Sequence, residues 1–97
     1  MSFAEGAMLV RVSGGAVSFY DTYTTTNLFV PRAFGGDVNT ITVSNDSASD
    51  TVVLSFNGAT VDGELAKGES ITLNTTQKTS IYIRGTTGGG TVRIWGW

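Results

Sequence analysis

The side chains that most often carry out chemistry are either missing or isolated in this chain. Its 97 residues include no histidine and no cysteine, which removes the commonest general base, the Ser-His-Asp and Cys-His arrangements and the usual zinc ligands. Two carboxylate pairs remain, Asp62 with Glu64 and Asp46 with Asp50. Asp62 and Glu64 flank Gly63 in a turn, where solvated acids are common, so we interpret them as turn residues rather than as a glycosidase pair. The sequence therefore predicts a protein that is not an enzyme.

Two further segments invite a ligand interpretation. Residues 45–50 (NDSASD) place several side-chain oxygens in one loop, as calcium requires, but only two carboxylates contribute and the EF-hand spacing is missing. Asn, Asp and Ser stabilise turns by bonding their own backbone, which explains this loop without a metal. Residues 88–90 are three glycines followed by a predicted strand rather than by Lys-Ser/Thr and a helix, so they indicate a hairpin connection and not a phosphate loop. We expect no cofactor and no metal.

The run Arg93-Ile94-Trp95-Gly96-Trp97 is the strongest candidate for a contact surface. Side chains alternate between the two faces of a strand, so Arg93, Trp95 and Trp97 share the face opposite Val92 and Ile94. Large aromatic residues and arginine are enriched at the centres of protein interfaces. Three interpretations remain open: a subunit or partner interface, tryptophans that close the end of the protein's own core, and a platform on which sugar rings stack.

Short apolar-alternating runs position these residues and predict an antiparallel β module over residues 51–97. Asn57-Gly58, Lys67-Gly68 and residues 88–90 separate the runs and are typical of turns. The side chains expected on the core face are Val52, Leu54, Phe56, Ile71, Leu73, Ile81, Ile83, Val92 and Ile94.

The first half of the chain carries weaker strand signals. Residues 8–12 alternate in polarity and 16–20 resume after a Ser-Gly-Gly break, which predicts a hairpin. Phe19 and Tyr20 fall on opposite faces, so at least one is expected to be partly exposed or at a contact. The Thr-rich run 21–27 is interpreted as a loop or an exposed edge.

The only proline divides the next part of the predicted sheet. We expect a short strand at residues 28–30 that ends at Pro31, because proline has no N–H for a ladder. Residues 31–36 then form a predicted loop in which Phe34 either plugs the core or contacts a partner. A strand over residues 38–44, with Ile41 and Val43 inward, is expected to pair antiparallel with residues 51–56. The fold class predicted is all-β: a small antiparallel β-sandwich or jelly-roll-like barrel of about 7–8 strands.

Length and charge narrow the function further. The 97 residues are expected to form one domain, residues 1–97, with residues 1–7 as a flexible or partner-contacting arm. Charged residues make up only 14%, the net charge is −2 and the six cations are scattered, which argues against nucleic-acid binding. The N-terminal residues show neither the pattern of a signal peptide nor a membrane span.

Four segments are similar to small β-sandwich virion proteins of tailed bacteriophages. They are NDSASDTVVLSFNG, LAKGESITL, KTSIYIRG and the final VRIWGW, and the similarity covers about residues 38–97. The resemblance implies a non-enzymatic structural role as a capsid decoration (cement) protein or as a tail or head-fibre component. It implies a homo-oligomer, with a trimer preferred over a dimer, that is attached to the major capsid protein or to another virion protein.

The resemblance also favours a place on the virion, with the capsid surface preferred over the tail. The alternative is a carbohydrate- or receptor-binding module of a tail or fibre. In either case neither a nucleic acid nor a membrane is an expected partner. We predict partner contacts at Phe3, Arg32, Phe34, Arg93, Trp95 and Trp97.

Overall fold

The computed structural model describes residues 19–97, and all regular structure in that range is β-strand. The predicted strand at residues 8–12, the arm at residues 1–7 and Phe3 lie outside the described residues. The strands in chain order are β1 (Phe19–Thr24), β2 (Val30–Asn45), β3 (Val52–Ser55), β4 (Gly63–Leu65), β5 (Ser70–Gly85) and β6 (Thr91–Gly96). Residues 19–97 include no helix that is long and apolar enough to cross a membrane.

The strands form one antiparallel sheet in the order β1-β6-β2-β5-β3-β4. The predicted all-β antiparallel fold is therefore confirmed. The described residues hold six strands rather than the 7–8 expected for the whole chain. One reason is that two runs expected as separate strands belong to the single long strand β2.

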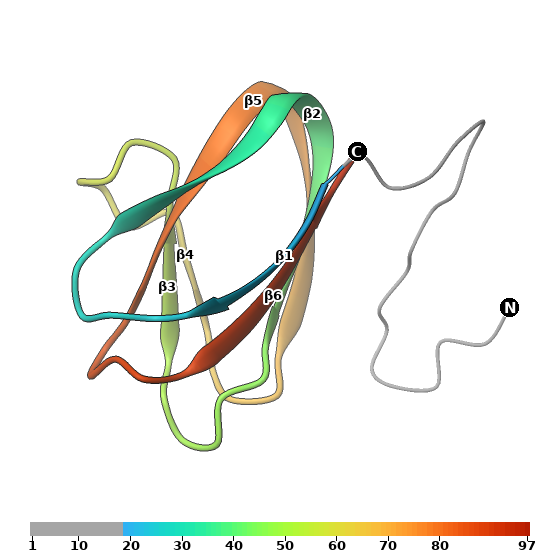
Figure 1. The fold of residues 1–97 in the computed structure, drawn as a ribbon. Helices are drawn as coiled ribbons and strands as arrows, with labels where there is room; N and C mark the ends of the chain where they lie inside the picture. Colours follow the sequence, from blue (N-terminus) through green and yellow to red (C-terminus); the bar gives the residue numbers. More distant parts are fainter. Residues whose placement is uncertain (1–18) are drawn as a thin grey trace, which may run out of the picture.

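The long strands β2 and β5 form a ribbon that bends sharply at its middle (Figure 1). The pairing register shifts between Ala33 and Val38 and again before Thr40, which marks irregular, bulge-like positions. Gly35 has a φ of 77° at this bend, and Gln77 on β5 has a φ of 50°. The Gln77 N–H donates to the Asn39 side-chain oxygen at 3.0 Å, a bond that ties the two strands together where the ladder is interrupted.

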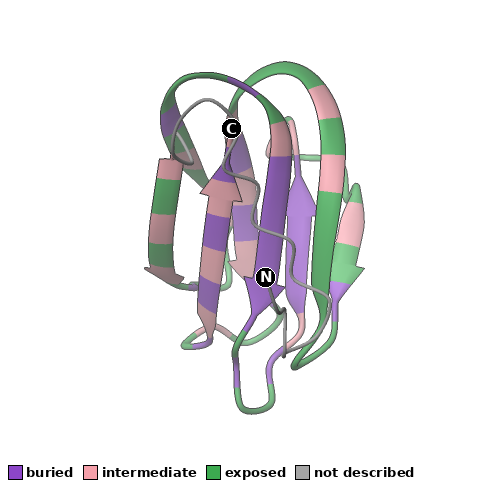
Figure 2. Ribbon diagram, turned by 90° about the vertical axis from the view of Figure 1, so that its right-hand side faces the viewer, coloured by how far each residue is buried: buried purple, intermediate pink, exposed green. Residues whose placement is uncertain are grey.

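The bend folds the sheet over so that its two halves enclose one hydrophobic core. We call β1, β6, residues 40–45 of β2 and residues 70–74 of β5 the first half, and residues 30–33 of β2, residues 80–85 of β5, β3 and β4 the second half. Burial is concentrated in β3, in residues 41–45 of β2 and in alternate residues of β6 and of residues 81–85, whereas β1 and residues 70–79 of β5 are mostly exposed or half-buried (Figure 2). The core residues are Phe34, Val38, Ile41, Val43, Val52, Leu54, Leu65, Ile81, Ile83, Val92 and Ile94.

The predicted loop at residues 31–36 was wrong, because β2 continues through Pro31 to Asn45. Pro31 pairs with Tyr82 of β5 on one side, and no other described strand pairs with residues 30–33. A missing N–H is tolerated on such an edge, since it removes no ladder bond there. The proline therefore marks an edge rather than the end of the strand.

The predicted pairing of residues 51–56 with residues 38–44 was also wrong. β3 pairs with β5 and β4 instead, so the connection after Asn45 crosses from the first half of the sheet to the second. Residues 40–44 of β2 already have β6 on one side and β5 on the other, which leaves no free edge for β3.

The fold leaves two seams where the edges of the two halves approach each other. At the β1/β2 seam, β1 lies near residues 30–34 of β2 without a backbone ladder. At the β4/β5 seam, β4 and residues 70–74 of β5 follow each other in the chain but do not pair. Side chains fill the β1/β2 seam, whereas the β4/β5 seam contains a cavity.

Candidate functional site

The outer face of the first half carries a row of side chains from four strands. The pairing register places Tyr20 of β1 beside Trp95 of β6, Trp95 beside Thr42 of β2, and Thr42 beside Thr72 of β5. Val92 and Ile94, which flank Arg93 and Trp95 along β6, are fully buried in the core. The predicted division of the last strand into an inner and an outer face is therefore confirmed. We call the row and the side chains next to it the outer face.

An aromatic pair with a guanidinium beside it occupies one side of the outer face. The Tyr20 and Trp95 rings lie 5.4 Å apart at a tilted angle, and the Arg93 guanidinium carbon lies 5.2 Å from the Trp95 ring centre. Arg93 also binds the carboxylate of Asp46, with its Nη2 donating at 3.2 Å. These contacts hold Arg93 against Trp95, and Tyr20 remains 55% exposed. The pair is thus positioned before any partner arrives.

Hydroxyl groups occupy the other side of the outer face and bond to one another. The Thr42 and Thr72 hydroxyls are 2.9 Å apart, and the Ser70 hydroxyl donates to Ser44 at 3.0 Å. Ser44 in turn donates to the Asp46 carboxylate at 3.2 Å. Their mutual bonds reduce the freedom of these side chains. Thr42 and Ser44 are themselves buried, whereas Ser70 and Thr72 are exposed.

The six residues predicted to contact partners do not form one patch. Arg93 and Trp95 lie together on the outer face. Trp97, which is half-buried, follows β6 and pairs through its backbone with Thr40, donating at 3.0 Å and accepting at 2.9 Å. Arg32 is at the β1/β2 seam, and Phe3 lies outside the described residues. Whether any of them contacts a partner stays a prediction.

Phe34 requires a correction because it is buried and only 5% exposed. Its ring packs against Phe19 at 5.1 Å in an edge-on arrangement and belongs to the core cluster. A partner cannot reach it in this structure. Of the two roles that the sequence left open for Phe34, the structure supports the one in the core.

Arg32 makes its contacts within the chain. Its Nη2 and Nε lie 2.6 Å and 2.7 Å from the same oxygen of Asp21, and its guanidinium carbon lies 4.4 Å from the ring centre of Tyr23. The side chain therefore joins β1 to β2 across the seam.

Tyr20 is an exposed aromatic residue of the outer face that was not among the predicted partner contacts. The sequence did indicate it, because Phe19 and Tyr20 were expected on opposite faces with at least one of them partly exposed. Phe19 packs against the core and Tyr20 is exposed, as expected. The proximity of Tyr20 to Trp95 depends on β1 pairing with β6, which is distant in sequence and has no local signature.

Three of the four carboxylates considered for chemistry make hydrogen bonds or ion pairs within the fold. Asp62 accepts the Phe56 N–H at 2.8 Å and so closes a turn, whereas Glu64 is exposed on β4. Asp46 binds Arg93, and Asp50 faces the loop at residues 86–88. Within residues 19–97, no group of three or more potential metal-ligating side chains lies close together.

Asp50 connects two loops that are far apart in sequence. Its carboxylate accepts the hydroxyls of Thr86 at 2.6 Å and Thr87 at 3.1 Å, together with the backbone N–H groups of Thr87 and Gly88, both at 3.1 Å. The Thr86 hydroxyl first, and then the two N–H groups, lower the pKa of Asp50 from 3.8 to about 2, against the opposing effect of burial. A Cβ at Gly85 would collide with this carboxylate, so the site requires glycine.

No family model matches the chain, and no curated protein shows significant sequence similarity to it.

Proposed function

We propose that this chain is a non-enzymatic structural protein of a tailed-phage virion, a capsid decoration protein that binds the major capsid protein through its outer face. The observation that carries the proposal is the Tyr20–Trp95 pair, held by Arg93 beside a ladder of bonded hydroxyls. Aromatic and arginine side chains are the residue types that dominate binding energy at interface centres. The rigid surroundings would reduce the entropy lost on docking.

The phage-like segments support the same proposal because they build this face and the strands behind it. The final VRIWGW segment contains β6 with Arg93 and Trp95, and the LAKGESITL segment contributes Ser70 and Thr72 to the hydroxyl ladder. The decoration protein would act as a homo-oligomer, preferably a trimer, on the capsid surface.

Binding to capsids that lack this protein tests the proposal. Purified chain is added to such particles, and bound chain is measured by cosedimentation over a range of concentrations. Trp95→Ser should weaken binding by about 30-fold or more, because truncation of a central aromatic typically costs 2 kcal/mol or more. Leu28→Ser is the matched control, since Leu28 is an exposed apolar residue away from the outer face. Failure of the unmodified chain to cosediment, or equal losses in both variants, would overturn the proposal.

A carbohydrate- or receptor-binding module of a tail or fibre is the second candidate, favoured by the exposure of Tyr20 next to Trp95. Aromatic rings can stack on sugar rings, and the exposed hydroxyls of Ser70 and Thr72 could bond to the polar groups of the sugar. Tryptophan fluorescence during titration with oligosaccharides tests it. A saturable change that Tyr20→Ser abolishes would support glycan binding over capsid binding, whereas unchanged emission across a glycan panel would exclude it.

A further inference from the structure

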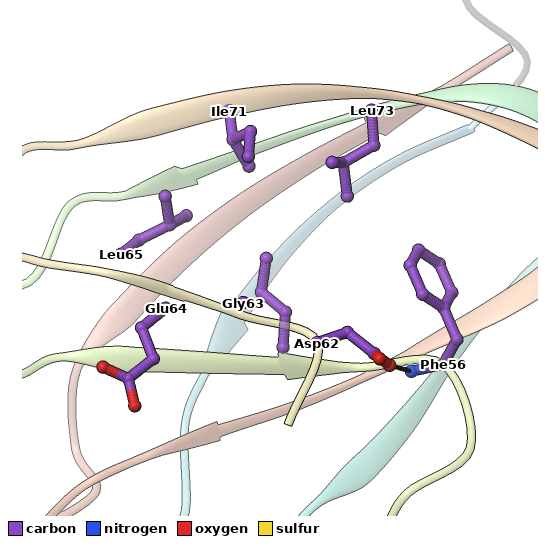
Figure 3. Close-up of a pocket in the computed structure, with 8 residues that line it drawn as sticks. Phe56, Asp62, Gly63, Glu64, Leu65, Ile71 and Leu73 are labelled. Carbon is purple, nitrogen blue, oxygen red and sulfur yellow. Dashed lines mark hydrogen bonds between the residues drawn. The ribbon is translucent and has the colours of Figure 1, made fainter. Parts of the chain in front are cut away.

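The β4/β5 seam contains an apolar cavity that the outer-face proposal does not use. The chain turns tightly between β4 and β5, with the Glu69 N–H donating to the Ala66 carbonyl at 3.0 Å, yet the two strands then diverge without pairing. Between them lies a cavity of about 110 Å³. Figure 3 shows side chains from both strands and from the end of β3 pointing into this space. The apolar lining residues are Leu54, Phe56, Leu65, Ile71 and Leu73.

We call the cavity and the two strand edges beside it the slot, and two features indicate what kind of occupant it accepts. Small-molecule sites generally enclose about 300–1,000 Å³, so a cavity of about 110 Å³ fits one or two aliphatic side chains better than a free ligand. Both walls are also unpaired strand edges within residues 19–97: β4 ends the described sheet, and among the described strands residues 70–74 of β5 pair with β2 alone. An edge of this kind accepts another extended segment through its backbone groups.

We propose that residues 8–12 of a second copy of this chain insert between β4 and β5 as an additional strand. The segment reads Met-Leu-Val-Arg-Val, and it is comparable in length to the open edge at residues 70–74. Met8 and Val10 would share one face and enter the cavity beside Leu73 and Ile71. Leu9 and Arg11 would face outward. The proposal is independent of a role in a virion.

Charge supports this placement. With Val10 opposite Ile71 and the strands antiparallel, Arg11 falls beside Ser70, next to Glu69 at the turn. Glu64 is exposed on β4 across the slot. A cation on the outward face of the inserted strand would thus face the exposed Glu64 carboxylate, whereas the Glu69 carboxylate accepts the Ala66 N–H at 2.7 Å.

The register explains why a second copy is a better donor than the same chain. Phe19 is level with Gly96, Ile41 and Leu73, so it lies three strand spacings from β5. In a strand inserted antiparallel to β5, Val12 would lie one strand spacing beyond β5. It would also lie about four residues along the strand direction from the level of Phe19. The resulting distance between Val12 and Phe19 is about 24 Å. Residues 13–18 reach at most about 25 Å when fully extended. A connection within one chain would therefore have to run straight across the outer face, whereas a second copy has no such constraint.

Disulfide crosslinking of the full-length chain tests the insertion, because the chain has no cysteine of its own. Copies carrying Leu9→Cys are mixed with copies of a different mass carrying Thr72→Cys and oxidised under mild conditions. These positions face each other in the proposed register. We expect a covalent heterodimer, and Leu9→Cys mixed with Thr22→Cys should give none, since Thr22 lies on β1 at the opposite edge of the outer face.

Other crosslinking outcomes are decisive as well. A heterodimer from Arg11→Cys with Thr72→Cys would support the same slot with the inserted strand shifted by two residues. A bond that forms only within a chain carrying both Leu9→Cys and Thr72→Cys would identify the same chain as the donor and overturn the proposal. The absence of any bond in all combinations would overturn it too.

Charge variants of the inserted segment give a second test that does not disturb the described fold. Val10→Asp places a charge on the face that enters the cavity, and Leu9→Asp places the same charge on the outward face. We expect sedimentation equilibrium to show association about 100-fold weaker for Val10→Asp and nearly unchanged for Leu9→Asp. Equal effects in both variants, or an unmodified chain that is monomeric at all concentrations, would refute the insertion.

Discussion

The two seams of the folded sheet differ in how the gap between the two halves is filled. At the β1/β2 seam, the Asp21–Arg32 ion pair, the Arg32–Tyr23 contact and the Phe19–Phe34 ring pair fill the gap from within the chain. At the β4/β5 seam the apolar side chains meet a cavity, and Ile71 remains 36% exposed.

The difference shows which part of the molecule is complete by itself. The β1/β2 seam brings polar and aromatic side chains together so that each has a partner, although no backbone ladder crosses it. The β4/β5 seam offers apolar surface and strand edges on both sides, a combination that favours association with another chain. Stability measurements on each seam can strengthen or break this distinction.

The largest expected effect is at the β1/β2 seam. Phe34→Ala should lower the free energy of unfolding by about 3–5 kcal/mol, because it removes a fully buried ring and leaves a cavity. Phe56→Ala at the β4/β5 seam should cost only about 1–2 kcal/mol, since that ring is partly exposed. Urea denaturation of both variants measures the difference. Equal losses would mean that the two seams are equally well packed.

Asp50 belongs to neither seam and provides a reference for the rest of the fold. Its pKa is lowered from 3.8 to about 2 in the folded chain, so the ionised carboxylate stabilises the fold above pH 3.8, and this contribution is lost as the pH falls toward 2. Asp50→Asn should reduce stability at pH 7 and flatten the fall in stability between these pH values. Denaturation curves at several pH values provide the measurement, and an unchanged slope would argue against the role of the carboxylate.

Two matched substitutions on β5 compare the β4/β5 seam with the interior of the protein. Ile71→Thr should cost about 1 kcal/mol or less in the single chain, because Ile71 is already partly exposed. Ile81→Thr on the same strand should cost about 2–4 kcal/mol, since it places a hydroxyl in the core at a fully buried position. Denaturation at low protein concentration checks both values. A large loss for Ile71→Thr would show that the seam is not open.

The smallest effect is expected for the ion pair of the closed seam. A double-mutant cycle with Asp21→Asn and Arg32→Gln should give a coupling energy of about 0.5–1 kcal/mol, because both side chains retain some contact with solvent. The coupling should weaken as the salt concentration rises. A value near zero would assign the closure of this seam to the aromatic rings alone.

Local patterns in the sequence predicted the fold class and the faces of several strands. Alternation placed Ile41, Val43, Val92 and Ile94 in the core, and all four are buried there. Alternation also predicted Trp95 on the opposite face, where the structure has it. These predictions succeed because the polarity of adjacent residues depends only on the two-residue period of a strand.

The errors arose where a local signal competed with a distant partner. Pro31 and the two glycines after it are typical of a loop, but β5 holds the segment in a bent strand. The loop around Asp50 was interpreted as a self-contained polar turn, and one bond fits that interpretation: the Ser47 N–H donates to Asn45 Oδ1 at 3.0 Å. The bonds from Asp50 to residues 86–88 were not predictable from the sequence alone, because they depend on the path of the whole chain.

The order of strands in the first half of the sheet has a consequence for synthesis on the ribosome. β6 lies between β1 and β2, so β1 has no partner in the described sheet until residues 91–96 have left the exit tunnel. Until then β1 and one edge of residues 41–45 remain unpaired, and late completion of such long-range contacts favours slow folding. A nascent chain stalled before residue 91 should therefore be much more sensitive to protease, or more dependent on chaperones, than one stalled after the whole segment has emerged.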